Sequence, residues 1–266
     1  MLLTSSEPQV VHLDLMDVFE AMSPPPIPAP RPDPGQLRRL LTLLTGDEKH
    51  GPATLSTLDV LWVLHARVLR IDPASPGDPD RDRFVLSKGH GPAAYYAVLA
   101  ACGFLDEALL PTFGQWESPL GWHPDRLRIP GVEVSSGSLG HGLAIAVGIA
   151  LSLRAQRHHE PRVVCLLGDG ECEEGSVHEA AALAGRERVG SLTAVVVDNH
   201  STSLGWPGGI GSRFSVEGWE TCTVDGRDRA ALEAALSVRR EGDPRGGTPR
   251  LVVADIEAGV PERAAA

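Results

Sequence analysis

The stretch from Arg162 to Gly205 constrains the fold of this chain more than any other part of its sequence. It opens with a continuous apolar run, 163–167, which is too short for a helix and suits a strand buried on both faces. A Gly-Asp-Gly turn at 168–170 and a helical segment with small residues on one face follow, and a second apolar run, 192–197, ends in Asp-Asn. The pattern predicts a strand–helix–strand unit with polar residues after both strands, where open parallel sheets bind their ligands.

The rest of the chain alternates between strand-like and helix-like periods in the same way, without an internal repeat. Helix signals recur between the strand signals, and Ser56 or Thr57 is the expected cap of the second helix. This alternation predicts an α/β fold, a doubly wound and mostly parallel sheet with helices on both faces. The remaining expected strands are 83–86, 221–224 and 251–256, and the expected helices are 37–44, 55–68, 95–102, 105–113, 141–154 and 229–239.

Length and proline content suggest the domain organisation. The 266 residues suffice for one large or two small domains with a substantial core. Prolines crowd the stretch 24–34, which forbids a helix, so we expect residues 1–34 to be a Pro-rich extension, either a mobile tail or an arm that docks a partner. The folded domain is expected over 35–260, with a short tail at 261–266.

Charge and cysteine usage exclude several classes of function. The net charge is −11, from 24 basic and 35 acidic residues with no basic run, so neither nucleic acid nor an anionic membrane is an expected partner. No apolar stretch is long enough to span a bilayer, and the N-terminus lacks the basic region of a secretory signal. The four cysteines show neither metal-site nor disulfide spacing, so a cytoplasmic location is expected.

The two polar clusters of the central unit carry the chemistry. Asp169 and Asn199 follow the two strands directly, with 28 residues between Gly170 and Asn199, enough for one crossover helix and a return strand. A hard oxygen ligand at each strand end suits Mg²⁺ or Ca²⁺ carrying a bound diphosphate, and Gly168 and Gly170 let a phosphate approach the backbone. A solvated turn would explain either residue alone, but it explains the pair less well.

Seven blocks of sequence, in order, resemble the N-terminal, diphosphate-binding half of transketolase over residues 36–257. A Gly-Asp-Gly followed after some thirty residues by Asn resembles the thiamine diphosphate (ThDP) motif. That motif alone is weak, but the ordered series is specific, above all SKGH and SSGSLGHG. The blocks read KHGPATLSTLDVL, RDRFVLSKGHG, GWHPD, PGVEVSSGSLGHGLAIAVGIAL, LLGDGECEEGSVHEAA, DNHS and VDGRD.

The resemblance implies a thiamine-diphosphate-binding fold of the diphosphate-binding type and a role for each matching residue. Metal ligands would be the side chains of Asp169 and Asn199 and the main-chain carbonyl of Ser201. Catalytic residues would be three histidines near the reacting end of the cofactor, which hydrogen-bond and move protons, and a glutamate at the subunit junction: His50, His90, His123 and Glu174. The remaining implied cofactor contacts are His90, Ser138, Leu139, Gly140, Gly168, Gly170 and Glu171, beside Asp169 and Asn199.

The same resemblance implies a partner. In the family, the carboxylate that activates the cofactor and the arginines that bind a sugar phosphate lie in a second, pyrimidine-binding domain. This chain ends at Ala266 before such a domain, so we expect a separate C-terminal subunit, a heterotetramer, and a site completed at the interface. The Ala- and Gly-rich helix after Gly140 suits close packing.

The expected activity is transfer of a two-carbon ketol unit from a ketose, with or without a phosphate, to an aldehyde acceptor. The sequence 255–260 departs from the family pattern near the substrate, so the donor sugar stays open. Two alternatives also stay open: a component of another ThDP-dependent lyase or synthase, and a non-catalytic partner of a true transketolase. The blocks SKGH and GWHPD favour transketolase over the first, and the retained Asp169 and Asn199 argue against the second.

Overall fold

A computed structural model describes residues 34–45, 51–202, 205–238 and 247–257 of the chain. The expected tail at 261–266 and all but the last residue of the expected extension lie outside the described residues, as does His50. In the described part of the chain, no helix combines the length and the apolar character that crossing a membrane requires.

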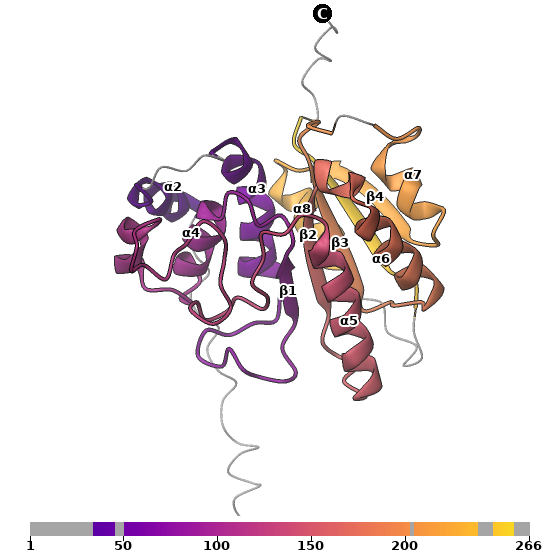
Figure 1. Cartoon of the computed structure of the whole chain (residues 1–266), viewed down its shortest axis with the longest axis horizontal. Coiled ribbons are helices and arrows are strands. Elements are labelled where there is room, and N and C mark those ends of the chain that lie inside the picture. The colour runs from indigo at the N-terminus through magenta and orange to yellow at the C-terminus, as the bar shows by residue number, and fades with distance from the viewer. Residues whose placement is uncertain (1–33, 46–50, 203–204, 239–246, 258–266) are drawn as a thin grey trace, which may run out of the picture. The chain divides into compact units, whose positions relative to one another are not determined.

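Five parallel strands form one sheet in the order β1-β2-β3-β5-β4 (Figure 1). Each parallel neighbour is reached through a crossover, so all carboxyl ends lie at one edge. This confirms the expected parallel α/β fold and all five expected strands. Their bounds are β1 Arg83–Leu86, β2 Val163–Gly168, β3 Leu192–Asp198, β4 Glu220–Asp225 and β5 Arg250–Asp255.

Helices cover both faces of the sheet, because successive residues of the buried strands alternate between two cores. Val164 and Leu166 of β2 belong to one core, which is shared with four α-helices, whereas Cys165 and Leu167 belong to the other, shared with three. The first face carries α2 Pro34–Leu43, α3 Gly51–Val63, the π-helical turn Leu64–Val68, α4 Ala93–Ala101 and α8 Arg229–Leu236. The second carries α5 His141–Ala155, α6 Gly175–Arg186 and α7 Gly209–Ser215.

The central unit has the expected form. Strand β2 is buried along its whole length, and β2 pairs with β3 so that Gly168 lies opposite Val197. Helix α6 joins the two strands and buries its small residues, which lets it lie close to the sheet. The buried residues of α6 are the four that the sequence pattern indicates, Val177, Ala180, Ala181 and Ala184.

Three local expectations are wrong. Helix α3 begins at Gly51, so Ser56 and Thr57 lie buried within it and do not cap it. The stretch 105–113 forms a 3₁₀ helix, Glu107–Thr112, with Pro111 inside it. Helix α7 was not expected, because its seven residues include two glycines and too few apolar residues to show a helical period.

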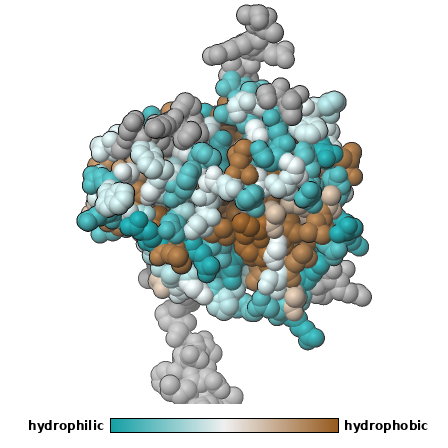
Figure 2. Space-filling view, in the orientation of Figure 1, coloured by the Kyte–Doolittle hydropathy of each residue, from teal (hydrophilic) through white to brown (hydrophobic). Residues whose placement is uncertain are grey.

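Outward-facing residues of α5 are apolar or small, and Figure 2 shows apolar side chains gathered over this helix. Ile145 is exposed there, and so is Gly148, around which an added Cβ would meet no atom within 4 Å. Gly142, by contrast, packs directly on Ser87: a Cβ at Gly142 would lie 2.7 Å from the Ser87 Cα. The close approach that the glycines of this helix predict is therefore real at its first turn.

Candidate functional site

A buried carboxylate lies at the carboxyl end of the sheet. Asp169 follows β2 and is only 1% exposed. It accepts hydrogen bonds from the Ser201 backbone NH at 2.5 Å, the Ser201 hydroxyl at 2.9 Å and the Thr202 NH at 3.1 Å. The loop after β3 is thus folded around the carboxylate, which brings together residues that are more than thirty positions apart.

Asn199 completes this group of oxygens. With its amide nitrogen toward Asp169, it donates to Asp169 Oδ1 at 2.7 Å and to Ser201 Oγ at 2.8 Å. With its amide oxygen turned the same way, oxygens of Asn199 and Asp169 face each other, which a cation between them stabilises. Carboxylate and amide oxygens are ligands that Mg²⁺ and Ca²⁺ prefer, so these residues fit a divalent metal.

The described residues contain no group of three or more His, Cys, Asp or Glu side chains that could hold a metal ion. A metal at this position would therefore depend on amide or backbone oxygens in addition to Asp169. The Ser201 amide and hydroxyl point to Asp169. The role of the Ser201 carbonyl as a ligand stays a prediction.

The Gly-Asp-Gly turn leaves room for an anion. A Cβ at Gly170 would find its nearest neighbour, Ser201 Oγ, only at 3.9 Å, so the backbone there borders open space. A Cβ at Gly168 would lie 3.1 Å from Lys88 Nζ. Burial lowers the pKa of Lys88, while the negative charges of Asp169 and Glu171 act in the opposite direction. Lys88 thus provides a positive charge among the carboxylates of the turn.

Glu171 points into the protein. It is 3% exposed, and its Oε1 accepts hydrogen bonds from the Ser87 hydroxyl at 2.5 Å and the Gly140 NH at 2.9 Å. The other oxygen, Oε2, accepts from the Gly168 NH at 3.3 Å. Burial raises the pKa of Glu171, against the lowering effect of these hydrogen bonds. The expected cofactor contact of Glu171 therefore stays a prediction, and the structure shows this carboxylate bonded to protein groups.

The turn 136–140 lies against the loop that follows β1. Gly137 has φ +123°, and a Cβ there would overlap the His123 ring at 2.6 Å, while a Cβ at Gly89 would lie 2.6 Å from the Gly137 nitrogen. Among the described residues, the buried Ser136 Oγ has no hydrogen-bond partner. Leu139 is 46% exposed. The turn thus offers both a free hydroxyl and an apolar side chain for contact with a ligand.

Two of the expected histidines lie together. The rings of His90 and His123 are 5.0 Å apart and nearly perpendicular. His123 Nδ1 lies 3.0 Å from the Gly89 carbonyl oxygen. Because a carbonyl only accepts, Nδ1 carries the proton, and in the neutral ring Nε2 is left as an acceptor for a substrate or cofactor proton. The expected third histidine, His50, lies outside the described residues.

The remaining expected residues lie at the rim. Glu174 is exposed and begins α6, and a Cβ at Gly140 would lie 2.7 Å from its Cβ. Ser138 is exposed on the turn 136–140. The geometry therefore joins Asp169, Asn199, Ser201 and the turn in one region, and the role of Glu174 at a subunit junction stays a prediction.

Sequence reasoning missed Ser87 and Lys88 as members of this site. Both lie in the block SKGH directly after β1, and the strand-end position was the signal that could have indicated them. Glu173 was also missed: it accepts a hydrogen bond from the Thr202 hydroxyl, which ties the loop after β3 to the turn after β2.

With this geometry in view, the comparison with protein families is decisive: the family described as "Transketolase, thiamine diphosphate binding domain" matches residues 42–261. The chain belongs to this family. The resemblance inferred from the sequence blocks is thereby confirmed, and thiamine diphosphate is the cofactor that defines the domain.

Relatives of known name and structure agree with the family. A protein of Clostridium sp. (strain MSTE9) called 6-deoxy-6-sulfo-D-fructose transketolase subunit SqwG is 36% identical over 204 residues, 73% of this chain and 74% of that protein. The transketolase structure from Campylobacter jejuni is similar with a TM-score of 0.67 and 27% identity. That match covers 83% of this chain and 37% of the solved chain, so this chain spans about a third of a complete transketolase.

A further relative has a different kind of name. The Rhodococcoides fascians protein called ferredoxin fas2 is 54% identical over 220 residues, 83% of this chain and 71% of that protein. Iron–sulfur clusters are held by several clustered cysteines. The cysteines of the described residues are instead dispersed: Cys165 and Cys172 are buried in the core over α5 and α6, and Cys102 and Cys222 pack on the opposite core. The part of this chain that the structure describes therefore has no cluster-binding set.

Proposed function

We propose that this chain is the diphosphate-binding subunit of a two-chain, Mg²⁺- and ThDP-dependent transketolase. The enzyme would transfer a two-carbon ketol unit from a ketose or ketose phosphate to an aldehyde acceptor in the cytoplasm. One observation carries the proposal: the oxygens of Asp169 and Asn199 lie together at the ends of β2 and β3. His90 and His123 belong to the neighbouring loops that pack on the turn 136–140.

In this proposal Asp169, Asn199 and the Ser201 carbonyl hold the metal, with Ca²⁺ as a possible substitute for Mg²⁺, and the metal holds the diphosphate beside Gly170. The site has a strongly acidic lining, with Asp169, Glu171 and Asp198 in electrostatic contact. An anionic diphosphate would be repelled here without a divalent cation, so cofactor binding should depend strictly on the metal. When bound, thiamine diphosphate supplies the nucleophilic carbon and the electron sink of the reaction.

The two histidines act on protons and hydroxyl groups. His123 is oriented by the Gly89 carbonyl through its Nδ1, which leaves Nε2 free to accept a proton from a substrate hydroxyl. His90 packs edge-on against His123 and limits its rotation. These residues, with His50, would orient the sugar and exchange protons with it. Leu139 would cover the apolar ring of the cofactor and exclude water.

A second chain would supply the pyrimidine-binding domain, in a heterotetramer. Two observations support a partner: this chain spans 37% of the C. jejuni transketolase, and a relative of similar extent is named as a subunit. The apolar outer surface of α5, beside the exposed Glu174, is a suitable contact for such a chain (Figure 2).

The test is co-expression with a candidate pyrimidine-domain chain, followed by calorimetry with ThDP, with and without Mg²⁺, and by a ketol-transfer assay. We expect ThDP binding only in the presence of Mg²⁺, and turnover only from the assembled pair. His123→Ala should lower turnover about 100-fold and leave ThDP affinity near the wild-type value. His159→Ala, a change at an exposed position, is the matched control and should be neutral.

Equal ThDP affinity with and without Mg²⁺ would refute the metal-diphosphate site. Binding without ketol transfer, but with activity toward a 2-oxo acid, would instead favour another ThDP-dependent lyase or synthase. Assembly with a complete transketolase, without any contribution to its turnover, would favour a non-catalytic partner.

A further inference from the structure

Glu171 binds three separate segments with one carboxylate. Its oxygens accept hydrogen bonds from Ser87 at the end of β1, Gly140 at the start of α5 and Gly168 at the end of β2. These segments are up to 84 residues apart in sequence. Glu171 and Ser87 are both 3% exposed, so this group of bonds lies beneath the site surface.

The Ser87 hydroxyl extends the arrangement by one step. It donates to Glu171 and accepts the Gly142 NH at 3.0 Å. Glu171 thus satisfies the free NH groups at the start of α5 twice, directly at Gly140 and through Ser87 at Gly142. No side chain of the helix itself caps this end, since the capping position is Gly140 in a left-handed conformation.

The position of the turn 136–140 follows from these bonds. The turn ends at Gly140, and Gly142 cannot retreat or advance because its Cα packs on Ser87. The negative charge of Glu171 also lies at the positive end of the α5 dipole, with Lys88 nearby. The turn is therefore fixed relative to β2, whose next residue but one beyond Leu167 is Asp169.

We propose that Glu171 is a positioning residue that holds the turn 136–140 at a fixed distance from Asp169, so that the two sides of the cofactor site stay matched. This role rests on the proposed ThDP site and adds a function to a carboxylate that does not itself reach the ligand. Loss of the link releases the turn, with Ser136 and Leu139 on it, while the oxygens of Asp169 and Asn199 keep their places.

The test uses the full chain and the variants Glu171→Gln, Ser87→Ala and the double variant. Gln keeps the size of Glu171 but presents an NH₂ group to an NH donor and removes the charge. Glu160→Gln, the same change at an exposed position near the opposite end of the sheet, is the control. Two quantities are measured: hydrogen exchange of segment 136–143 without ligand, and the dissociation constant for ThDP with saturating Mg²⁺ well below the unfolding temperature.

We expect both single variants to speed exchange of segment 136–143 at least tenfold, with strand β3 unchanged. The ThDP dissociation constant should rise about 10- to 100-fold, the usual effect of removing a residue that orients ligands from behind. The double variant should match Glu171→Gln within about twofold, because both residues act through one bond.

The outcomes separate the two proposals. If the wild-type chain and its assembled pair bind no ThDP, the proposed function is wrong and the positioning role falls with it. If wild type binds and the folded variants bind equally well, or exchange of segment 136–143 is unchanged, only the positioning role is wrong. Should Glu171→Gln fail to fold, Ser87→Ala alone decides by the same two measurements.

Discussion

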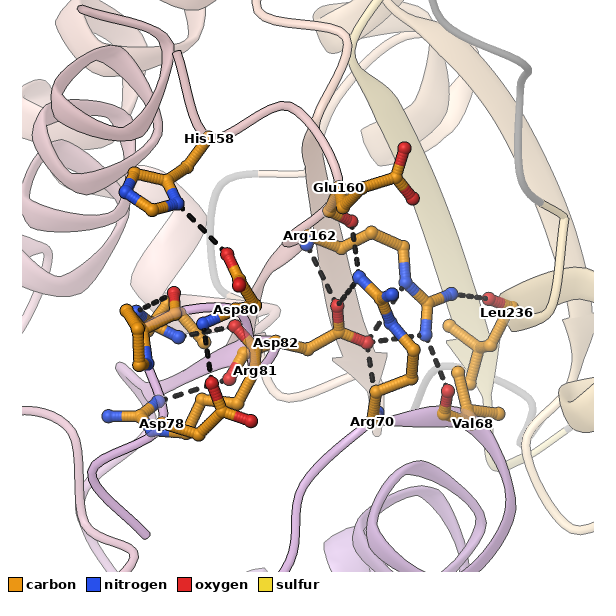
Figure 3. Close-up of polar contacts among 12 residues, drawn as sticks. Val68, Arg70, Asp78, Asp80, Arg81, Asp82, His158, Glu160, Arg162 and Leu236 are labelled. Atoms are coloured by element: carbon orange, nitrogen blue, oxygen red, sulfur yellow. Dashed lines mark hydrogen bonds and ion pairs between the residues drawn. The ribbon is translucent and has the colours of Figure 1, made fainter. Parts of the chain in front are cut away.

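The two ends of the parallel sheet each bury an aspartate, and they treat it differently. Asp82, near the amino ends of β1 and β2, is 0% exposed, and Asp169 at the carboxyl end is 1% exposed. Asp82 lies between two guanidinium groups: Arg162 donates from Nη2 at 2.8 Å and Nε at 3.2 Å, and Arg70 from Nη2 at 3.4 Å (Figure 3). The backbone NH groups of Arg70 and Arg162 complete its shell.

Asp169 has no such arginine among its hydrogen-bond partners in the described residues; it is bonded by amides and a hydroxyl. Buried charges are stable only when paired, hydrogen-bonded or bound to metal. At the amino end the pairing is complete within the chain. At the carboxyl end it is left to Lys88 and, in our proposal, to a divalent cation. The comparison separates a carboxylate that serves the fold from one that is kept available for a ligand.

The largest effect is expected from Asp82→Asn. The change leaves the nearly buried Arg162 without its counter-charge and turns an NH₂ group toward NH donors. The free energy of unfolding should fall by about 3–5 kcal/mol, measured by urea denaturation. Cofactor affinity of the remaining folded protein should stay at the wild-type value. A large loss of ThDP affinity in this variant would show that the two ends are not independent.

The same substitution at the other end, Asp169→Asn, should have the opposite profile. Removing the charge should weaken ThDP binding in the presence of Mg²⁺ by at least 100-fold, about 3 kcal/mol. Stability without ligand should change by less than about 1 kcal/mol, because the hydrogen-bonding oxygen is kept and a repulsive charge is lost. Calorimetry and urea denaturation of the pair of variants test this directly. A destabilisation as large as that of Asp82→Asn would contradict the distinction.

A pH effect on stability should arise at the amino end. His65 lines the same small cavity as Asp82, donates from Nδ1 to the Leu61 carbonyl, and packs edge-on against Phe84. Burial lowers the pKa of His65 to about 4. The unfolded chain takes up this proton near pH 6.5, so the stabilisation is complete above that pH and is lost as the pH falls toward 4.

Unfolding measured at pH 5 should therefore cost about 2 kcal/mol less than at pH 7.5 on account of His65 alone. His65→Gln should flatten the profile between pH 4 and 6.5, since Gln can still donate to Leu61 and does not titrate. His159→Gln, at an exposed position, should leave the profile unchanged. An unchanged profile in His65→Gln would assign the pH dependence to other groups.

The smallest effects are expected along α5, which begins at the site end. Gly148→Ala should raise the free energy of unfolding by up to about 1 kcal/mol, because the position is exposed and free of neighbours. Gly142→Ala should lower it, since the new Cβ would overlap Ser87. The two thermal melts compare one chemical change at two positions of a helix. Equal shifts would show that the contact with Ser87 yields easily.

Much of the fold was predictable because buried parallel strands read as continuous apolar runs. Strands β2 and β3, the turn between Gly168 and Gly170, and the small buried residues of α6 all follow from local patterns. The same patterns place Asp169 and Asn199 at neighbouring strand ends, and the structure brings these two side chains together.

The residues that escaped prediction depend on contacts between distant parts of the chain. Charged residues are normally exposed, so nothing local shows that Glu171 points inward or that Asp82 is buried. The bond from Arg162 to Asp82 joins residues 80 positions apart, and the bond from Ser87 to Glu171 joins residues 84 apart. Such pairs have no sequence period.

The pairing of β2 with β3 has a practical consequence for protein engineering. Gly168 lies opposite Val197, and the next residues on each strand lead directly to Asp169 and Asn199. A slip of one residue would turn every inward side chain outward and separate the two oxygens. The strand alignment therefore acts as the ruler of the site. Transplanting the site into another parallel sheet would require copying that alignment first, before any of the surrounding loops.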